Sequence, residues 1–297
     1  MKTTPLHASL LSLALLSPLA PTPARADSTI APANAFAWCG NVGWLNWRPS
    51  LADGVLTGEY VCSGKVWAAN AGWINLGSGT PANGIRYQNN DGTDSGVNLL
   101  ADGKLRGLAW GANIGWVNFA ANGNPRIDFA TGILSGYAWG ANVGWITLDD
   151  GANHFVATTA IPAGADTNGN GITDAWELEH AGNLTTFTIV GDADGDGIPD
   201  VLEYAADTDP LNPADRGLRI TDFAVSADTT LISLTWTSHL SRRYHIESTD
   251  DLAGGVWTES ALGNIAPDSD VTTLRGLTEI AANQRFYRIR ATRPLMP

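Results

Sequence analysis

The chain has 297 residues, a formal net charge of −13 at pH 7, two cysteines and twelve tryptophans. This negative charge is local, because residues 149–215 contain fourteen Asp or Glu side chains and no Lys or Arg. The remaining residues together have a net charge of +1. The lack of a basic patch excludes nucleic acid as an expected partner. A local cluster of carboxylates instead favours cations.

Residues 1–26 are predicted to be a signal peptide. Lys2 supplies a positive charge, residues 10–20 are mostly apolar, and Ala24 and Ala26 are small residues suited to cleavage after residue 26. The apolar run is roughly half of the ~20 residues that a transmembrane helix needs, and no later stretch is long enough. We therefore expect a secreted protein, extracellular or periplasmic, without a transmembrane segment.

Residues 27–160 contain four copies of the pattern Trp-x-x-Asn-x-Gly-Trp. Each copy predicts a strand, a tight turn and a second strand, because Asn tolerates left-handed backbone conformations and Gly adopts them freely. Two turn signals per unit and no helical period predict an all-β repeat domain, which could be a barrel, a propeller-like ring or a short solenoid. The paired tryptophans are Trp38 and Trp44, Trp67 and Trp73, Trp110 and Trp116, and Trp139 and Trp145.

These tryptophans allow two interpretations. Their strict repetition favours paired rings that form the core and staple each turn. The alternative is a ligand platform of exposed tryptophans that stack on sugar rings. The repeated Asn is expected to form the turn or to satisfy buried backbone groups. The four units resemble tryptophan- and glycine-rich repeats of exported bacterial proteins of unknown function, a resemblance that implies no chemistry.

The two cysteines, Cys39 and Cys62, are predicted to form a disulfide, as is usual in an oxidising compartment. Two free, buried thiols are the alternative. A zinc site is not expected, because no further Cys and no nearby His complete a ligand set.

Residues 161–215 are predicted to bind calcium. Residues 166–177 and 192–203 share one layout, with side-chain oxygens at positions 1, 3, 5, 9 and 12 and Gly at position 6, which is the spacing of an EF-hand loop. Short helices are expected over residues 174–180 and 200–206, leaving each loop. The expected ligands are Asp166, Asn168, Asn170, Asp174, Glu177 and the Ile172 carbonyl in loop one, and Asp192, Asp194, Asp196, Asp200, Glu203 and the Ile198 carbonyl in loop two.

The segment departs from a paired EF-hand in two ways. It has no entering helices, and Pro199 at position 8 of loop two cannot donate the backbone N–H that pairs twin loops. We therefore expect a structural site, not a calcium sensor. The Asp-x-Asp-x-Asp-Gly-Ile-Pro-Asp run resembles thrombospondin type 3 repeats, although Glu177 and Glu203 follow the EF-hand pattern.

Residues 216–297 alternate again and predict some six short strands in a small β-sandwich. The expected core is Trp236, Tyr244, Ile246, Trp257, Phe286 and Ile289. Residues 244–257 and 286–289 resemble the fibronectin-III-like C-terminal modules of large bacterial exported proteins. That resemblance implies an adhesion or spacer module.

The sequence thus predicts a mainly β protein in three parts: a Trp-rich repeat domain, a short helical calcium-loop connector and a C-terminal sandwich. The expected function is that of a calcium-stabilised structural or adhesive protein, with an unidentified protein or glycan partner at the cell surface. The alternative is a carbohydrate-binding module that uses the tryptophan faces. An enzyme is not expected, because the histidines are scattered and no Gly-x-Ser-x-Gly context supports a catalytic triad.

Overall fold

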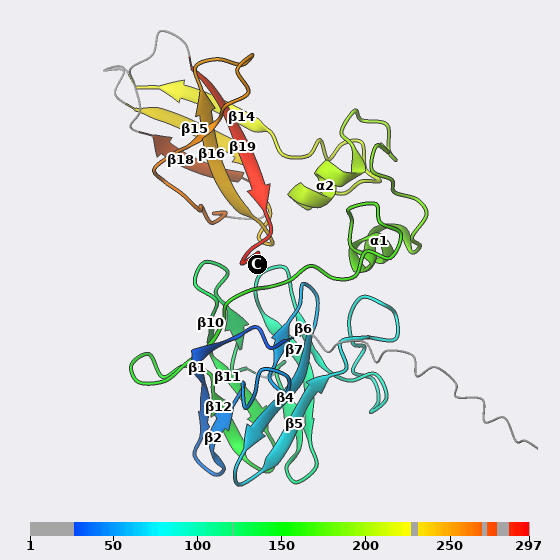
Figure 1. The fold of residues 1–297 in the computed structure, drawn as a ribbon, viewed down its shortest axis with the longest axis vertical. Coiled ribbons are helices and arrows are strands. Elements are labelled where there is room, and N and C mark those ends of the chain that lie inside the picture. The colour runs from blue at the N-terminus through cyan, green and yellow to red at the C-terminus, as the bar shows by residue number, and fades with distance from the viewer. Residues whose placement is uncertain (1–26, 121, 227–230, 269–271, 278–284, 297) are drawn as a thin grey trace, which may run out of the picture.

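A computed structural model describes residues 27–120, 122–226, 231–268, 272–277 and 285–296. The expected signal peptide, residues 1–26, lies outside the described residues. The described chain is mainly β, with a lower body formed by the repeats, an upper body formed by the C-terminal strands, and two short helices beside the junction (Figure 1). The mainly β prediction is confirmed.

The strands of the lower body are β1 (Ile30–Cys39), β2 (Gly43–Asn46), β3 (Leu56–Thr57), β4 (Cys62–Ala68), β5 (Gly72–Gly77), β6 (Val97–Leu99), β7 (Leu105–Gly111), β8 (Gly115–Asn118), β9 (Arg126–Ile127), β10 (Ile133–Ser135), β11 (Tyr137–Gly140), β12 (Gly144–Thr147) and β13 (Val156–Thr158). The helices are α1 (Asp174–Ala181) and α2 (Asp200–Ala206). The upper body contains β14 (Ile220–Val225), β15 (Ile232–Thr237), β16 (Arg243–Thr249), β17 (Thr258–Glu259), β18 (Thr272–Leu277) and β19 (Phe286–Thr292).

The four repeats form a closed barrel. Each repeat contributes one antiparallel hairpin, and the strands follow the order β12-β11-β8-β7-β5-β4-β2-β1, with β1 pairing back onto β12. Among the three architectures left open by the sequence, the barrel is therefore the observed one. Strands β13, β10 and β9 continue from the first half of β1, and β3 and β6 flank β4 and β7.

A ring of asparagine hydrogen bonds joins the four hairpin turns. The repeated Asn of each turn donates its side-chain amide to a backbone carbonyl of the neighbouring hairpin, and the last hairpin closes onto the first. The bonds run from Asn41 to Val143 (2.9 Å), from Asn70 to Val42 (3.3 Å), from Asn113 to Ala71 (3.2 Å) and from Asn142 to Ile114 (3.1 Å). The repeated Asn thus satisfies backbone carbonyl groups, which is one of the two roles expected from the sequence.

The repeated Gly occupies the left-handed position of each turn. In the third hairpin, Ile114 N–H donates to the Gly111 carbonyl, and Gly115 follows with a φ of +75°. A type I turn followed by a left-handed residue is a common three-residue hairpin connection, and Gly adopts that conformation without strain.

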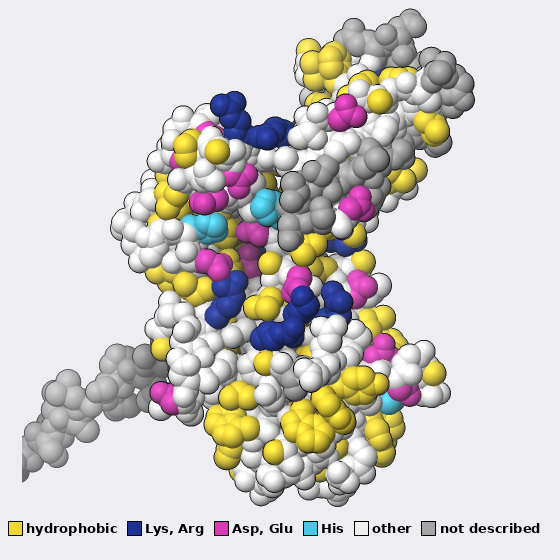
Figure 2. All heavy atoms as spheres, turned by 180° about the vertical axis from the view of Figure 1, so that it is seen from behind, with side chains coloured by type: hydrophobic (Ala, Val, Ile, Leu, Met, Phe, Trp, Pro, Cys, Tyr) yellow, Lys and Arg dark blue, Asp and Glu magenta, His cyan; other side chains and the backbone are white. Residues whose placement is uncertain are grey.

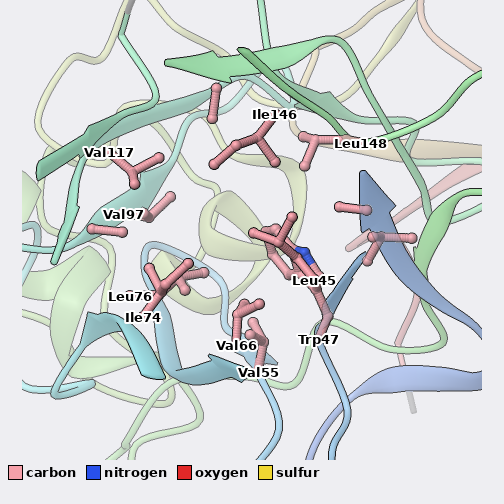
Figure 3. Packing of buried hydrophobic residues seen from close by; sticks show 14 of the residues in the cluster. Leu45, Trp47, Val55, Val66, Ile74, Leu76, Val97, Val117, Ile146 and Leu148 are labelled. Atoms are coloured by element: carbon pink, nitrogen blue, oxygen red, sulfur yellow. The ribbon is translucent and has the colours of Figure 1, made fainter. Parts of the chain in front are cut away.

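The expectation that the paired tryptophans form the core is wrong. All eight face outward, with exposed fractions between 37% for Trp139 and 50% for Trp44. The residues that alternate with the tryptophans face the interior instead, and those directly before each first Trp and directly after each second Trp are small or branched (Figure 3). Eight strands enclose a space just wide enough for such side chains, so it has no room for eight indoles. These interior residues are Ala37, Leu45, Val66, Ile74, Ala109, Val117, Ala138 and Ile146.

The predicted Cys39–Cys62 disulfide is also absent, since both cysteines are free and buried. Cys39 pairs with Gly43 at the turn end of the barrel. Cys62 begins β4 and lies six residues before Ala68, which places it about 20 Å along the strand from that end. A disulfide needs Cα atoms within about 7 Å, so this register excludes the bond.

The upper body consists of two three-stranded sheets, β14-β15-β18 and β17-β16-β19. They share a core of Ile232, Leu234, Trp236, Tyr244, Ile246 and Ile265, against which Ile289 packs. Two residues that were expected in this core lie outside it. Trp257 is only partly buried and lies under the Arg288 guanidinium, 4.2 Å from the ring centroid, and Phe286 is half-buried outside this cluster. Neither helix of the described residues is long and apolar enough to cross a membrane.

Candidate calcium centre

The two acidic loops have the local structure that the sequence predicts. Helix α1 begins at position 9 of loop one and ends at Gly182, which has a left-handed conformation, and α2 begins at position 9 of loop two. Pro199 is the residue before α2, where a missing N–H costs nothing. Within the described residues no β-bridge joins the two loops, in agreement with the effect expected from Pro199.

The Asp side chain at position 1 holds the backbone of each loop in a tight turn. The Asp166 carboxylate accepts backbone N–H groups from Gly169, Asn170 and Gly171 at 2.8–3.1 Å. In loop two Asp192 accepts the corresponding three bonds from residues 195–197, at 2.8–3.2 Å. The Gly at position 6 has a positive φ in both loops, 85° at Gly171 and 96° at Gly197, which explains why that position requires Gly.

Position 9 closes each loop. Asp174 accepts the backbone N–H of Thr167 at 2.8 Å, and Asp200 accepts the backbone N–H of Ala193 at 2.8 Å. Asp200 is fully buried and also accepts the Thr188 N–H at 3.2 Å. These two expected ligands therefore hold the backbone of the loop in the structure as described.

Loop one satisfies its buried carboxylate with its own amides. Glu177 is fully buried, and it accepts hydrogen bonds from the side-chain Nδ2 of Asn168 at 3.1 Å and of Asn170 at 3.0 Å. The same amides also donate to the Leu184 and Phe187 carbonyls, at 2.9 and 3.1 Å. Burial raises the pKa of Glu177, and the two amides oppose that rise.

Loop two leaves its buried carboxylate without a donor. Glu203 is fully buried, and neither of its oxygens has a hydrogen-bond partner among the described residues. One carboxylate oxygen of Asp194 and one of Asp196 are also buried without a hydrogen-bond partner among the described residues. Burial, followed by the charges of Asp194 and Asp196, raises the pKa of Glu203 to about 8.

A divalent cation suits this donor set. Carboxylate oxygens of Asp192, Asp194 and Asp196 all lie within 4.8 Å of one another. Glu203, at position 12 of the same loop, has two buried oxygens that lack a hydrogen-bond partner among the described residues. Hard cations such as Ca²⁺ prefer oxygen ligands of this kind, with the position 7 carbonyls of Ile172 and Ile198 as further candidates. The residues present therefore fit the metal that the loop spacing implies.

The loops share a small hydrophobic core. Ile172, Trp176, Phe187 and Tyr204 are buried together, and Tyr60 from the barrel packs against them. The Trp176 ring lies 5.4 Å from the Tyr204 ring, centroid to centroid, so α1 and α2 contact each other directly. The two loops thus contact each other through these side chains.

The calcium segment is bonded to the barrel mainly through loop one. Thr173, just before α1, donates its hydroxyl to Glu59 at 3.2 Å. Glu179 of α1 forms an ion pair with Arg86, from the long loop between β5 and β6. Glu59 lies in the connection between β3 and β4, and it also pairs with Arg293 at 3.4 Å.

The segment is bonded to the upper body through α2. Arg242 is 3% exposed, and its guanidinium donates to the Tyr204 and Ala205 carbonyls at 2.6 and 2.9 Å. Asp207, the left-handed residue that ends α2, lies 3.5 Å from the same guanidinium. It also accepts bonds from the Trp176 indole, at 3.1 Å, and from the Ser241 hydroxyl. Figure 2 shows basic and acidic side chains gathered between the two bodies.

Sequence reasoning missed this junction. Glu59, Arg86, Arg242 and Arg293 are far apart in the sequence and belong to no motif. All four are charged residues of the two β regions, and sequence position alone does not bring them together.

The candidate ligand platform of eight tryptophans lies on the outer face of the barrel, where hydrophobic side chains gather in Figure 2. In each hairpin the two indoles contact each other, with ring centroids 4.7–4.9 Å apart. The first indole of a hairpin also stands opposite a polar residue of the adjacent hairpin. These polar neighbours are Thr147, Asn46, Asn75 and Asn118, opposite Trp38, Trp67, Trp110 and Trp139 respectively.

Comparisons of the chain with protein-family models, with curated proteins and with solved structures return no match. The functional proposals below therefore depend on the geometry of the chain itself.

Proposed function

We propose that this protein is an exported, calcium-stabilised structural or adhesive protein, in which a calcium-bound connector holds a Trp-repeat barrel and a C-terminal β-sandwich in a fixed relation. The observation that carries the proposal is Glu203, a fully buried carboxylate without a hydrogen-bond donor among the described residues, in the same loop as a cluster of three aspartates. Unpaired buried charge is strongly unfavourable, and a bound cation removes that cost.

The contacts on either side support the connector role. Loop one contacts the barrel through Thr173 and Glu179, and α2 contacts the sandwich through Arg242. A cation that stabilises the loops therefore stabilises the relation between the two β bodies. The export part of the proposal depends on residues 1–26, and a mass measurement of the secreted protein that shows cleavage after residue 26 would support it.

Calorimetry of the mature chain with calcium, with magnesium and with a chelator tests the proposal. A site occupied at 100 times its dissociation constant stabilises the folded state by about 2.7 kcal/mol. We expect the transition of the connector to rise in temperature with calcium, and to rise less with magnesium, which loses its water ligands reluctantly. An unchanged melting curve in chelator would contradict the proposal.

The outward tryptophans favour carbohydrate binding as a second candidate function. Half-exposed indoles beside amide and hydroxyl groups offer both a stacking face and hydrogen bonds to a neutral sugar. A glycan array followed by titration tests this, with Trp110→Ala and Trp116→Ala as the variants and Leu108→Ala as the control on the same hairpin. Binding that persists in both tryptophan variants, or no binding to any glycan, would remove the candidate.

A further inference from the structure

The two calcium loops differ at positions 3 and 5 alone among their side-chain ligand positions. Loop one has Asn168 and Asn170, and loop two has Asp194 and Asp196. An amide carries two N–H donors, whereas an ionised carboxylate only accepts hydrogen bonds. This difference decides whether each loop can satisfy its buried Glu without a cation.

Loop one is internally paired. Both amides donate to Glu177, at 3.0–3.2 Å, and they use their remaining hydrogens on the Leu184 and Phe187 carbonyls. The buried carboxylate of this loop therefore has donors before any metal binds. Rotation of an amide by half a turn would present its oxygen, so metal binding to loop one would first break these bonds.

Loop two has no such pairing. Glu203 is as fully buried as Glu177, yet both of its oxygens lack a donor within the part of the chain that the structure describes. One buried carboxylate oxygen of Asp194 and one of Asp196 also lack a donor among the described residues. Without a cation, loop two combines five carboxylates whose charges repel.

We propose that the two loops are unequal: loop one keeps its fold without metal, whereas loop two folds only around calcium. Since α2 begins in loop two and receives Arg242 of the sandwich, calcium then controls the attachment of the C-terminal sandwich. Helix α1 stays on the barrel through Arg86 and Glu59 whether or not calcium is present. This inference rests on the proposed calcium-stabilised connector and specifies which half of it responds.

Hydrogen exchange of the mature chain, in calcium chloride and in chelator, tests the inequality directly. Chelation is expected to reduce amide protection over residues 192–206 at least ~tenfold, while residues 166–181 keep theirs. Equal loss in both loops overturns the inference but leaves calcium stabilisation intact. No change in either loop, together with no heat of calcium binding, overturns both this inference and the proposed function.

A reciprocal exchange of residues provides matched variants. Asp194→Asn with Asp196→Asn gives loop two the amides of loop one, and we expect it to protect residues 192–206 in chelator and to reduce calcium affinity at least ~tenfold. Asn168→Asp with Asn170→Asp should make loop one lose protection in chelator. If neither exchange alters the calcium dependence of its loop, the amide–carboxylate pairing is not the cause and the inference is wrong.

Discussion

Arg242 is the residue whose loss should most affect the junction between α2 and the sandwich. Its guanidinium is buried, donates to the Tyr204 and Ala205 carbonyls and neighbours the Asp207 carboxylate. Replacement by Met, a side chain of similar length, removes the charge and all the donors while retaining much of the packing. Asp207 then lacks the only cation within ion-pair distance of it among the described residues.

The structure sets the size of the effect. Breaking a buried ion pair costs about 3–5 kcal/mol, because the remaining charge is left uncompensated. Asp207 is half-buried and keeps the Trp176 and Ser241 donors, so the lower end, about 3 kcal/mol, applies to Arg242→Met. Since the cost comes from the stranded charge, adding Asp207→Asn should recover part of it, about 1 kcal/mol.

Urea unfolding followed by circular dichroism, in calcium, measures these differences. Arg290→Met is the control, because Arg290 is largely exposed and its partner Glu247 keeps Arg288, so its loss should cost less than about 1 kcal/mol. A cost below about 1 kcal/mol for Arg242→Met, or a double variant less stable than Arg242→Met alone, would refute the reasoning.

The remaining predictions concern the barrel, the junction and the cysteines. Asn113→Ala should lower the free energy of unfolding, measured in urea, by about 1 kcal/mol. Asn113→Asp should lower it more, because a carboxylate acceptor would then face the Ala71 carbonyl. Equal stability of the wild type and both variants would contradict a contribution from the asparagine ring. Gly115→Ala should cost about 1–2 kcal/mol, since Gly115 has a φ of +75°, whereas Gly40→Ala, with no neighbour within 4 Å of the added carbon, should be near neutral. Burial alone would raise the pKa of Asp207, but Arg242, Ser241 and Trp176 hold that pKa below its usual range. The contribution of Asp207 is therefore present above its unfolded pKa of about 3.9 and is lost as the pH falls through the lower folded value, so the stability difference between wild type and Asp207→Asn should shrink in urea titrations toward pH 3. Both thiols are buried, and burial raises the pKa of the Cys62 thiol to about 12, so neither cysteine should be accessible to a thiol reagent until the chain unfolds, when both should react; no reaction after unfolding would indicate a disulfide.

The local structure of residues 166–203 could be predicted from the sequence in detail because the information for it is local. The spacing of Asp, Asn, Gly and Glu within twelve residues fixes the curl of each loop, and Gly182 ends α1 as expected. What the sequence did not reveal is the pairing of Asn170 with Glu177, because an amide at a ligand position reads equally as an oxygen donor to metal or as an N–H donor to a carboxylate.

The tryptophans show where local reasoning fails. Alternation along a strand separates two faces but does not say which face is inside. In the first repeat, Trp38 and Trp44 alternate with Ala37, Cys39 and Leu45, and the strict repetition of the indoles favoured them as the core. The deciding quantity is the width of the closed barrel, which follows from the number of paired strands and is not written in any single repeat.

Closure of the barrel has a consequence for how the chain reaches its native state. The first and fourth hairpins meet through β1 and β12, and Asn41 bonds to Val143 across 102 positions of the sequence. A nascent chain that has presented only three hairpins exposes two unpaired strand edges, which are templates for intermolecular pairing. Such long-range strand pairing also forms slowly. The barrel is therefore complete only when the last repeat has paired, and until then the chain is prone to aggregate.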